Sequence, residues 1–125
     1  MNALEFLGIT TEHVSTEKVI LKMTLWDNHL QPYGIMHGGI SALLIETATS
    51  MGANEYLDNS KRVAMGIDIQ TNHIRTAKKG EVLSVVATPD HIGNQIHVWQ
   101  ATIYNQDDQK ISVGRCTLMI KNLTP

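Results

Sequence analysis

Side chains between Glu17 and Trp26 alternate in polarity. Apolar residues occupy every second position from Val19 to Leu25, and a lysine and a threonine stand among the positions between them. Because successive side chains of a strand point to opposite faces, this stretch predicts a half-buried β-strand. The stretch Asn2–Leu7 predicts a short helix, and the polar stretch Asp27–Tyr33, which contains a proline, is typical of a loop.

A helical period begins after this loop. Apolar or small residues recur three or four positions apart along one side of the stretch, at Ile40, Leu43, Leu44, Thr47, Ala48 and Met51. The opposite side of the stretch is scarcely more polar. A helix that is apolar nearly all round is expected to be buried nearly all round. The one charged side chain between Gly38 and Asn54 is Glu46, a carboxylate that would be costly in such a place.

The rest of the chain is rich in strand-forming residues. Four further strands are predicted, at Arg62–Arg75, Glu81–Pro89, Gln95–Asn105 and Lys110–Lys121. Their connectors are short and carry turn residues, which favours antiparallel pairing of strands that follow one another. The pattern predicts one α+β domain over residues 1–125, an antiparallel sheet wrapped around one central helix. Because one sheet cannot cover both sides of the helix, we expect a homo-oligomer.

The composition of the chain excludes some classes of function. Apolar residues make up 42% of the 125 residues, charged residues make up 18%, and the net charge is −2. Such a chain offers no broad basic surface for a nucleic acid or an anionic membrane. The most apolar window, Ile40–Met51, is too short to span a bilayer. The N-terminal residues lack the features of a secretory signal and Cys116 is the one cysteine, so we expect a cytoplasmic protein.

Two features of the chain can carry chemistry. The first is His37-Gly38-Gly39, placed where the loop becomes the helix. Free backbone N–H groups and the positive end of the helix dipole gather at such a point, and the missing side chains let a ligand oxygen approach. This end of the helix can therefore polarise a carbonyl group and stabilise an oxyanion. The alternative is that the glycines serve only a tight turn.

The second feature is Glu46. A carboxylate held among apolar groups suits a general base, and a carboxylate can also act as a nucleophile. Ser50 follows one helical turn later on the same face, where it can orient the carboxylate or a water molecule. The alternative is an ion pair between Glu46 and a lysine or arginine of another subunit.

Gly38 and Glu46 are eight residues apart. Along one helix this is a separation of about 12 Å, so one helix cannot present both groups to the same carbonyl carbon. Two antiparallel copies of the helix, side by side in a dimer, can place Glu46 of one chain opposite Gly38 of the other. A catalytic pair therefore requires an oligomer whose sites are shared between subunits.

Several other residues have ordinary structural interpretations. The core is expected to contain Met65, Trp99, Cys116 and Met119, and His29 is expected at the surface. A small basic cluster suits either a nucleotide phosphate or a solvated turn and consists of Arg75, Lys78 and Lys79.

Three segments together resemble one known family: QPYGIMHGGISALLIETATSMG at 31–52, GIDIQTNHIRTAKKGE at 66–81 and HIGNQIHVWQATIYN at 91–105. The chain resembles the hotdog-fold acyl-CoA thioesterases, nearest to the 1,4-dihydroxy-2-naphthoyl-CoA thioesterases and the aryl-carrier-protein proofreading thioesterases. The resemblance implies a hotdog fold and hydrolysis of an acyl-CoA, or of an acyl or aryl carrier-protein thioester, to the free acid and the thiol. It also implies that no metal or redox cofactor is needed and that dimers pair into tetramers.

The resemblance implies roles for individual residues as well. Glu46 would be the nucleophile or general base, and the backbone N–H of Gly38 the oxyanion donor. The residues that position the thioester or the water would be Gln31, His37 and Ser50. Contacts with acyl-CoA are implied for Gly66, Asn72, His73, Arg75, Thr76, His91, Gly93 and Asn94.

Other functions fit these residues less well. A dehydratase of the same fold relies on an Asp/His pair on a different loop, which the sequence lacks. A non-catalytic acyl-CoA binding or sensing module predicts a neutral residue in place of Glu46, and a purely structural protein leaves Glu46, Gly38 and Arg75 without a common role. The acyl group stays open between dihydroxynaphthoyl, hydroxybenzoyl, phenylacetyl and aliphatic groups, as does the choice between nucleophile and base for Glu46.

Overall fold

The computed structural model of the chain describes residues 1–123. Its elements follow one another as α1 (Ala3–Leu7), β1 (Thr10–Val14), β2 (Val19–Thr24), the 3-10 turn η1 (Asp27–His29), α2 (Gly38–Asn54), β3 (Arg62–His73), β4 (Val82–Ile92), β5 (Ile96–Tyr104) and β6 (Lys110–Asn122). The long helix and the five predicted strands are confirmed to within a few residues at each end. Within the described residues, no helix is both long and apolar enough to cross a membrane.

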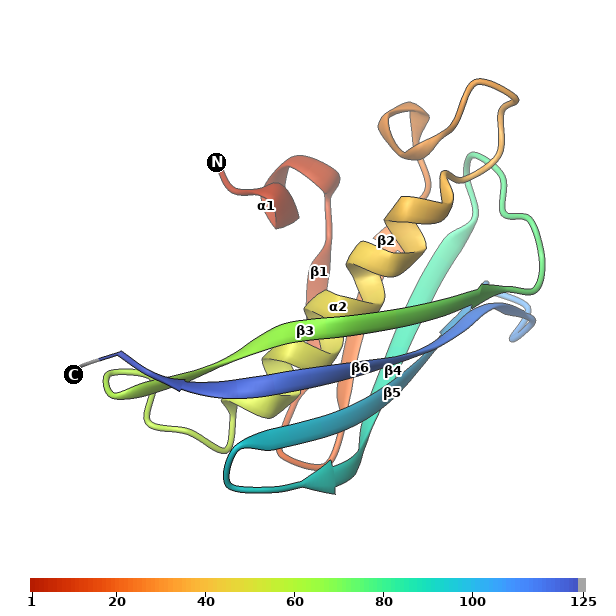
Figure 1. Ribbon diagram of the computed structural model, residues 1–125. Coiled ribbons are helices and arrows are strands. Elements are labelled where there is room, and N and C mark those ends of the chain that lie inside the picture. Colours follow the sequence, from red (N-terminus) through yellow and green to blue (C-terminus); the bar gives the residue numbers. More distant parts are fainter. Residues whose placement is uncertain (124–125) are drawn as a thin grey trace.

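The six strands form one antiparallel sheet in the order β1-β2-β4-β5-β6-β3. The sheet curves around α2, which runs along its concave side (Figure 1). Strands β2 to β6 all contact this helix. The predicted architecture, an antiparallel sheet wrapped around one central helix, is confirmed.

The sheet differs from the prediction at two places. β1 was not predicted, because its residues are exposed apart from the half-buried Val14 and therefore show no apolar alternation. β3 and β4 follow one another but do not pair, since β3 pairs with β6 and β4 pairs with β2. The prediction that β3 and β4 pair was wrong because the sheet curls. Its β3 edge lies over α2, and residues 74–81 cross from that edge to β4 (Figure 1).

One face of α2 fills the core. The buried residues of the helix are Ser41, Leu44, Ile45, Ala48, Thr49, Gly52 and Ala53. Gly52 lies so close to the indole of Trp99 that a Cβ atom there would overlap the ring. Trp99 and Cys116 are fully buried, as predicted.

Met65 and Met119 are not core residues, contrary to the prediction. Their side chains are 48% and 42% exposed. The two residues are partners in the register of β3 with β6, at positions that alternate with the inward-facing Ala64 and Leu118. Alternation along each strand therefore directs both methionines to the face of the sheet away from α2.

The other face of α2 lies open in the protomer. A groove of about 600 Å³ runs along it, lined by Leu4 of α1 and by Gly39, Ala42, Leu43, Glu46, Thr47, Ser50 and Met51. We call this the Glu46 groove. The sheet covers only one side of the helix, as expected for a single chain, and burial of the other side by a second subunit stays a prediction.

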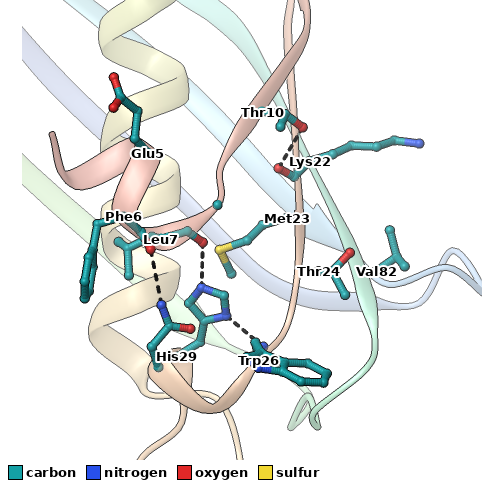
Figure 2. Close-up of a pocket in the computed structure, with 12 residues that line it drawn as sticks. Glu5, Phe6, Leu7, Thr10, Lys22, Met23, Thr24, Trp26, His29 and Val82 are labelled. Atoms are coloured by element: carbon teal, nitrogen blue, oxygen red, sulfur yellow. Dashed lines mark hydrogen bonds between the residues drawn. The ribbon is translucent and has the colours of Figure 1, made fainter. Parts of the chain in front are cut away.

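His29 is buried rather than at the surface, with an exposure of 2%. Its ring joins the N-terminal segment to the loop before α2 and lies beside a surface pocket (Figure 2). Nε2–H donates to the carbonyl of Leu7 at 2.7 Å, and Nδ1 accepts from the N–H of Trp26 at 2.9 Å. The loop that leads to α2 is thus held at its first turn by two hydrogen bonds of one imidazole.

Candidate active site

The N-terminus of α2 is capped by His37. The ring Nδ1 of His37 accepts a hydrogen bond from the N–H of Gly39 at 2.8 Å, and the backbone N–H of His37 donates to the carbonyl of His29 at 2.9 Å. Within residues 1–123, the N–H of Gly38 has no hydrogen-bond acceptor. This N–H stands at the positive end of the helix dipole, where an oxygen that gains negative charge is stabilised.

Gln31 lies in the loop that leads to this helix end. Its side-chain Oε1 accepts from the N–H of Tyr33, and its own N–H donates to the carbonyl of Ile35 at 2.9 Å. Gly34 has a φ of +84°, which the turn between these residues requires and which side chains disfavour. The tight turn holds Gln31 beside the start of α2.

A cavity of about 290 Å³ opens at this end of α2, and we call it the Gly38 cavity. It is lined by Gln31, Ile35, Met36, Gly38, Ser41, His73, Ile74, Arg75, Thr76, Ala77, Ile111 and Ser112. The cavity thus brings together five of the predicted site residues from three separate segments: Gln31, Gly38, His73, Arg75 and Thr76.

His73 lies directly over Gly38. A Cβ atom at Gly38 would stand 2.8 Å from Nε2 of the His73 ring, so the glycine makes this approach possible. The ring's Nδ1 is 3.3 Å from Oγ of Ser112, and Oγ of Ser112 is hydrogen-bonded to Oγ of Ser41 at 3.1 Å. Both serines are 1% exposed.

Ser41 and Ser112 were not among the predicted site residues. Each occupies an inward position in the middle of an apolar pattern, Ser41 on the buried face of α2 and Ser112 next to the buried Ile111. A polar residue at a core position is the signal that could have pointed to them, since buried hydroxyls need hydrogen-bond partners.

Glu46 lies two turns further along α2, with an exposed side chain in the Glu46 groove. Its carboxylate stands against Gly66 of β3, where a Cβ atom would be 2.5 Å from Oε2. Ser50, one turn on, lines the same groove as predicted, and Asn54 donates to its carbonyl at 2.8 Å. Gly66 therefore lies against the Glu46 carboxylate and does not line the Gly38 cavity.

Cys116 lies behind this carboxylate. A small cavity of about 190 Å³ is lined by Glu46, Gly66, Ile67, Asp68, Ile69 and Cys116. Burial raises the pKa of the Cys116 thiol, and the carboxylates of Glu46 and Asp68 raise it further, while a hydrogen bond with Thr49 lowers it. The thiol is therefore a protonated, inert part of the core.

A bulge in β3 sets which side chains face α2. The register with β6 runs from Gly66 opposite Leu118 to Asp68 opposite Thr117, so Ile67 has no partner. The extra residue puts Gly66 and His73 on the same face, against Glu46 and Gly38 respectively. Asn72 in turn points away from the helix and lines neither the Gly38 cavity nor the Glu46 groove.

The remaining predicted contacts lie in the turn between β4 and β5. His91 packs beside Gly93, whose N–H donates to the carbonyl of Ile96 at 2.9 Å, and Asn94 lines a separate surface pocket with Arg62. This turn is at the opposite end of the sheet from the start of α2 (Figure 1). One protomer thus brings together neither Gly38 with Glu46 nor the β4–β5 turn with the Gly38 cavity.

Comparison with known proteins gives a consistent result. The family model of the thioesterase superfamily matches residues 33–112. A glutamine-to-alanine variant of a Staphylococcus aureus thioesterase is 36% identical, with a TM-score of 0.91 over 94% of this chain and 97% of that chain. A Haemophilus influenzae thioesterase is 31% identical, with a TM-score of 0.91 over 99% of this chain and 85% of that chain.

Among curated proteins, the 1,4-dihydroxy-2-naphthoyl-CoA hydrolase of Escherichia coli is 31% identical over 119 residues, which are 95% of this chain and 86% of that protein. The family match, the relatives and the strand order around the long helix all lead to one assignment. The chain belongs to the thioesterase superfamily and is a thioester hydrolase with the hotdog fold.

Proposed function

We propose that this protein hydrolyses an acyl-CoA with an aromatic acyl group, such as 1,4-dihydroxy-2-naphthoyl-CoA or hydroxybenzoyl-CoA, to the free acid and CoA. Similar proteins of Escherichia coli and Listeria monocytogenes are named 1,4-dihydroxy-2-naphthoyl-CoA hydrolases. The observation that carries the proposal is the N–H of Gly38 at the start of α2, which has no acceptor among residues 1–123 and lies on the same helix as an exposed carboxylate.

The thioester carbonyl oxygen would accept a hydrogen bond from the N–H of Gly38. That oxygen gains negative charge as a nucleophile attacks the carbonyl carbon, and the helix N-terminus stabilises this charge. Gln31, which lines the same cavity, and His37, which caps the helix, would position the thioester or the water.

Glu46 would supply the attacking group, either by removing a proton from water or by attacking the carbonyl carbon itself. Ser50 on the same groove would orient the carboxylate or the water. In the first route the attacking water displaces the thiolate of CoA and gives the free acid directly. In the second route Glu46 displaces the thiolate and forms a mixed anhydride with the acyl group, and water then hydrolyses this anhydride to the free acid and the carboxylate of Glu46. The proposal uses no metal or redox cofactor.

The active site would be shared between two subunits. Gly38 and Glu46 are about 12 Å apart along one helix, so each needs its counterpart from another copy. β3 is the last strand of the sheet and runs past Glu46, so its free edge is available for a second β3. Antiparallel pairing of the two edges would lay the α2 helices side by side in opposite directions. It would also carry the β4–β5 turn toward the Gly38 end of the partner, where contacts of His91, Gly93 and Asn94 with acyl-CoA become possible.

The proposal is tested with a panel of aryl-CoA and alkyl-CoA thioesters, assayed with the wild type and with Glu46→Ala. Loss of a base or nucleophile predicts a rate at least about 10²-fold lower with every substrate. Glu55→Ala, which removes an exposed glutamate at the end of the same helix, serves as the matched control and should keep full activity. Hydrolysis retained in Glu46→Ala would refute the assigned role, and tight binding without hydrolysis by the wild type would instead support a non-catalytic acyl-CoA binding module.

A further inference from the structure

The N-terminal helix α1 forms one wall of the Glu46 groove. Leu4 is half-buried and lines the groove together with residues of α2. Glu5 and Phe6 are exposed and line the surface pocket on the other side of α1 (Figure 2). No residue of α1 is fully buried. The helix therefore adds little to the core, and its fixed place beside the groove needs another reason.

A five-residue helix is too short to be stable alone. In α1, however, all four carbonyl groups of the last turn accept a hydrogen bond, two from the backbone that follows and two from side chains of η1. Asn28 donates to the carbonyl of Phe6 at 3.3 Å, and His29 donates to that of Leu7 at 2.7 Å (Figure 2). The turn η1 therefore fixes where α1 and Leu4 stand.

The lining of the Glu46 groove suits an uncharged, apolar group. Glu46 is the one charged residue among the described residues that line it, so an anionic group would be repelled there. The hydroxyl of Thr47 already donates to the carbonyl of Leu43 at 2.7 Å, and the side chains of Leu4, Leu43 and Met51 offer apolar contact. The volume of about 600 Å³ lies in the range usual for small-molecule sites.

The shared active site decides which part of the substrate reaches this groove. The reacting carbonyl would lie between Gly38 of one subunit and Glu46 of the other, and the CoA arm and the acyl group leave the carbonyl carbon in different directions. Arg75 in the Gly38 cavity suits the phosphates of CoA. The acyl group is then left with the Glu46 groove, where Leu4 stands against it.

We propose that Leu4 is a specificity-determining residue that limits the size of the aromatic acyl group beside Glu46, and that Asn28 and His29 are positioning residues that hold α1 in place for this contact. This inference rests on the proposed function, in which the acyl group is aromatic and Glu46 supplies the attacking group. Leu4 touches the acyl group but not the reacting atoms. Asn28 and His29 act through α1 and do not touch the substrate.

The test compares kcat/KM for naphthoyl-CoA, whose acyl group has two fused rings, with kcat/KM for benzoyl-CoA, which has one. Leu4→Ala widens the groove and should raise the naphthoyl-to-benzoyl ratio at least about tenfold, since a missing methylene in an apolar pocket is worth about 10- to 200-fold. Leu4→Phe narrows the groove and should lower the ratio. Phe6→Ala, which removes an exposed side chain from the other side of α1, is the matched control and should leave the ratio unchanged. A ratio that neither Leu4 variant changes, or that both change in the same direction, would overturn the proposal.

Asn28→Asp tests how α1 is held. This variant keeps the shape of the side chain but loses the N–H that donates to the carbonyl of Phe6. The naphthoyl-to-benzoyl ratio should therefore move in the direction of Leu4→Ala, by a smaller factor. In a Leu4→Ala background Asn28→Asp should have no further effect on the ratio. An equal shift in both backgrounds would show that Asn28 does not act through Leu4.

Binding separates this proposal from the proposed function, because it needs no turnover. The Kd values of both thioesters are measured by calorimetry for Glu46→Gln, with and without Leu4→Ala. Their ratio should shift as the kinetic ratio does, and an unchanged ratio would overturn the role of Leu4. A wild type that binds both thioesters and hydrolyses neither would defeat the proposed function, while the Kd values still decide the role of Leu4. Absence of binding to either thioester would defeat both proposals.

Discussion

Adding a single methyl group at Gly66 should lower the activity of the protein and leave its stability nearly unchanged. Glu46 reaches β3 at a residue that has no side chain, and a Cβ atom there would stand 2.5 Å from Oε2, 3.1 Å from Cδ and 3.3 Å from Cγ of the glutamate. Real Cβ atoms essentially never come closer than 3.0 Å to another heavy atom, so in Gly66→Ala the carboxylate oxygen has to withdraw by at least about 0.5 Å.

A displacement of this size matters for catalysis more than for folding. Misplacing a reacting group by about 1 Å can cost about 10²-fold in rate, so we expect Gly66→Ala to lower kcat about 10- to 100-fold, or about 1.4 to 2.7 kcal/mol in the barrier. The fold should tolerate the change, because the atoms that must move belong to the end of an exposed side chain. The backbone of Gly66 is not in the left-handed region, so alanine fits it and should leave the free energy of unfolding unchanged or raise it by about 0.4–1 kcal/mol.

The assay is steady-state hydrolysis of the best aryl-CoA substrate together with urea unfolding of the same preparations. Glu46→Ala supplies the matched background, since without the carboxylate the new methyl group has nothing to displace and Gly66→Ala should have no further effect on the residual rate. A Gly66→Ala protein as active as the wild type would show that the position of the Glu46 carboxylate against β3 is irrelevant to the reaction.

Three further outcomes are expected. Gly52→Ala places a methyl group in the indole of Trp99 and should reduce the free energy of unfolding by about 1–3 kcal/mol, measured by urea unfolding; an unchanged stability would contradict the close packing of α2 on β5. Burial lowers the pKa of His97, and the nearby His91 lowers it further. The unfolded chain therefore binds this proton more readily, so stability should fall as the pH drops from about 6.5 through the lower folded pKa, and His97→Gln should flatten that dependence in unfolding experiments from pH 8 to pH 5. Treatment with EDTA should leave hydrolysis unchanged, because the proposed steps use only groups of the chain; a loss that a divalent metal restores would contradict them.

The alternation of Val19–Leu25 and the helical period after Gly38 were enough to predict the main elements, because each is amphipathic or apolar over many residues. β1 was not predicted because an exposed edge strand needs no apolar face. The pairing of β3 with β6 was not predicted for another reason. A short connector shows that two strand ends are near each other, but a strongly curved sheet also brings together the ends of strands that do not pair.

The site could be predicted where chemistry depends on residue type and local spacing. Gly38 at the helix start, Glu46 and Ser50 on one helical face, and the lining of the Gly38 cavity by Gln31 and Arg75 agree with the structure. The number of residues in a strand says nothing of a bulge, so the outward direction of Asn72 could not be foreseen.

Hydrogen bonds between distant segments were also beyond the sequence. The link from Ser41 to Ser112 joins residues 71 positions apart, and the burial of His29 depends on the carbonyl of Leu7, 22 positions away. No periodicity connects such pairs, because they meet only after the helix has docked in the sheet.

The unpaired Ile67 in β3 has a consequence for how such a chain can change length over time. Gly66 and His73 are an odd number of positions apart, and only the extra residue lets both face α2. Removing one regularly paired residue between them would turn one of the two outward, whereas removing the unpaired residue itself would leave an even spacing in a regular strand and keep both facing inward. Relatives that keep both the glycine and the histidine facing the helix are therefore expected to have either an odd spacing with a bulge between them or an even spacing without one.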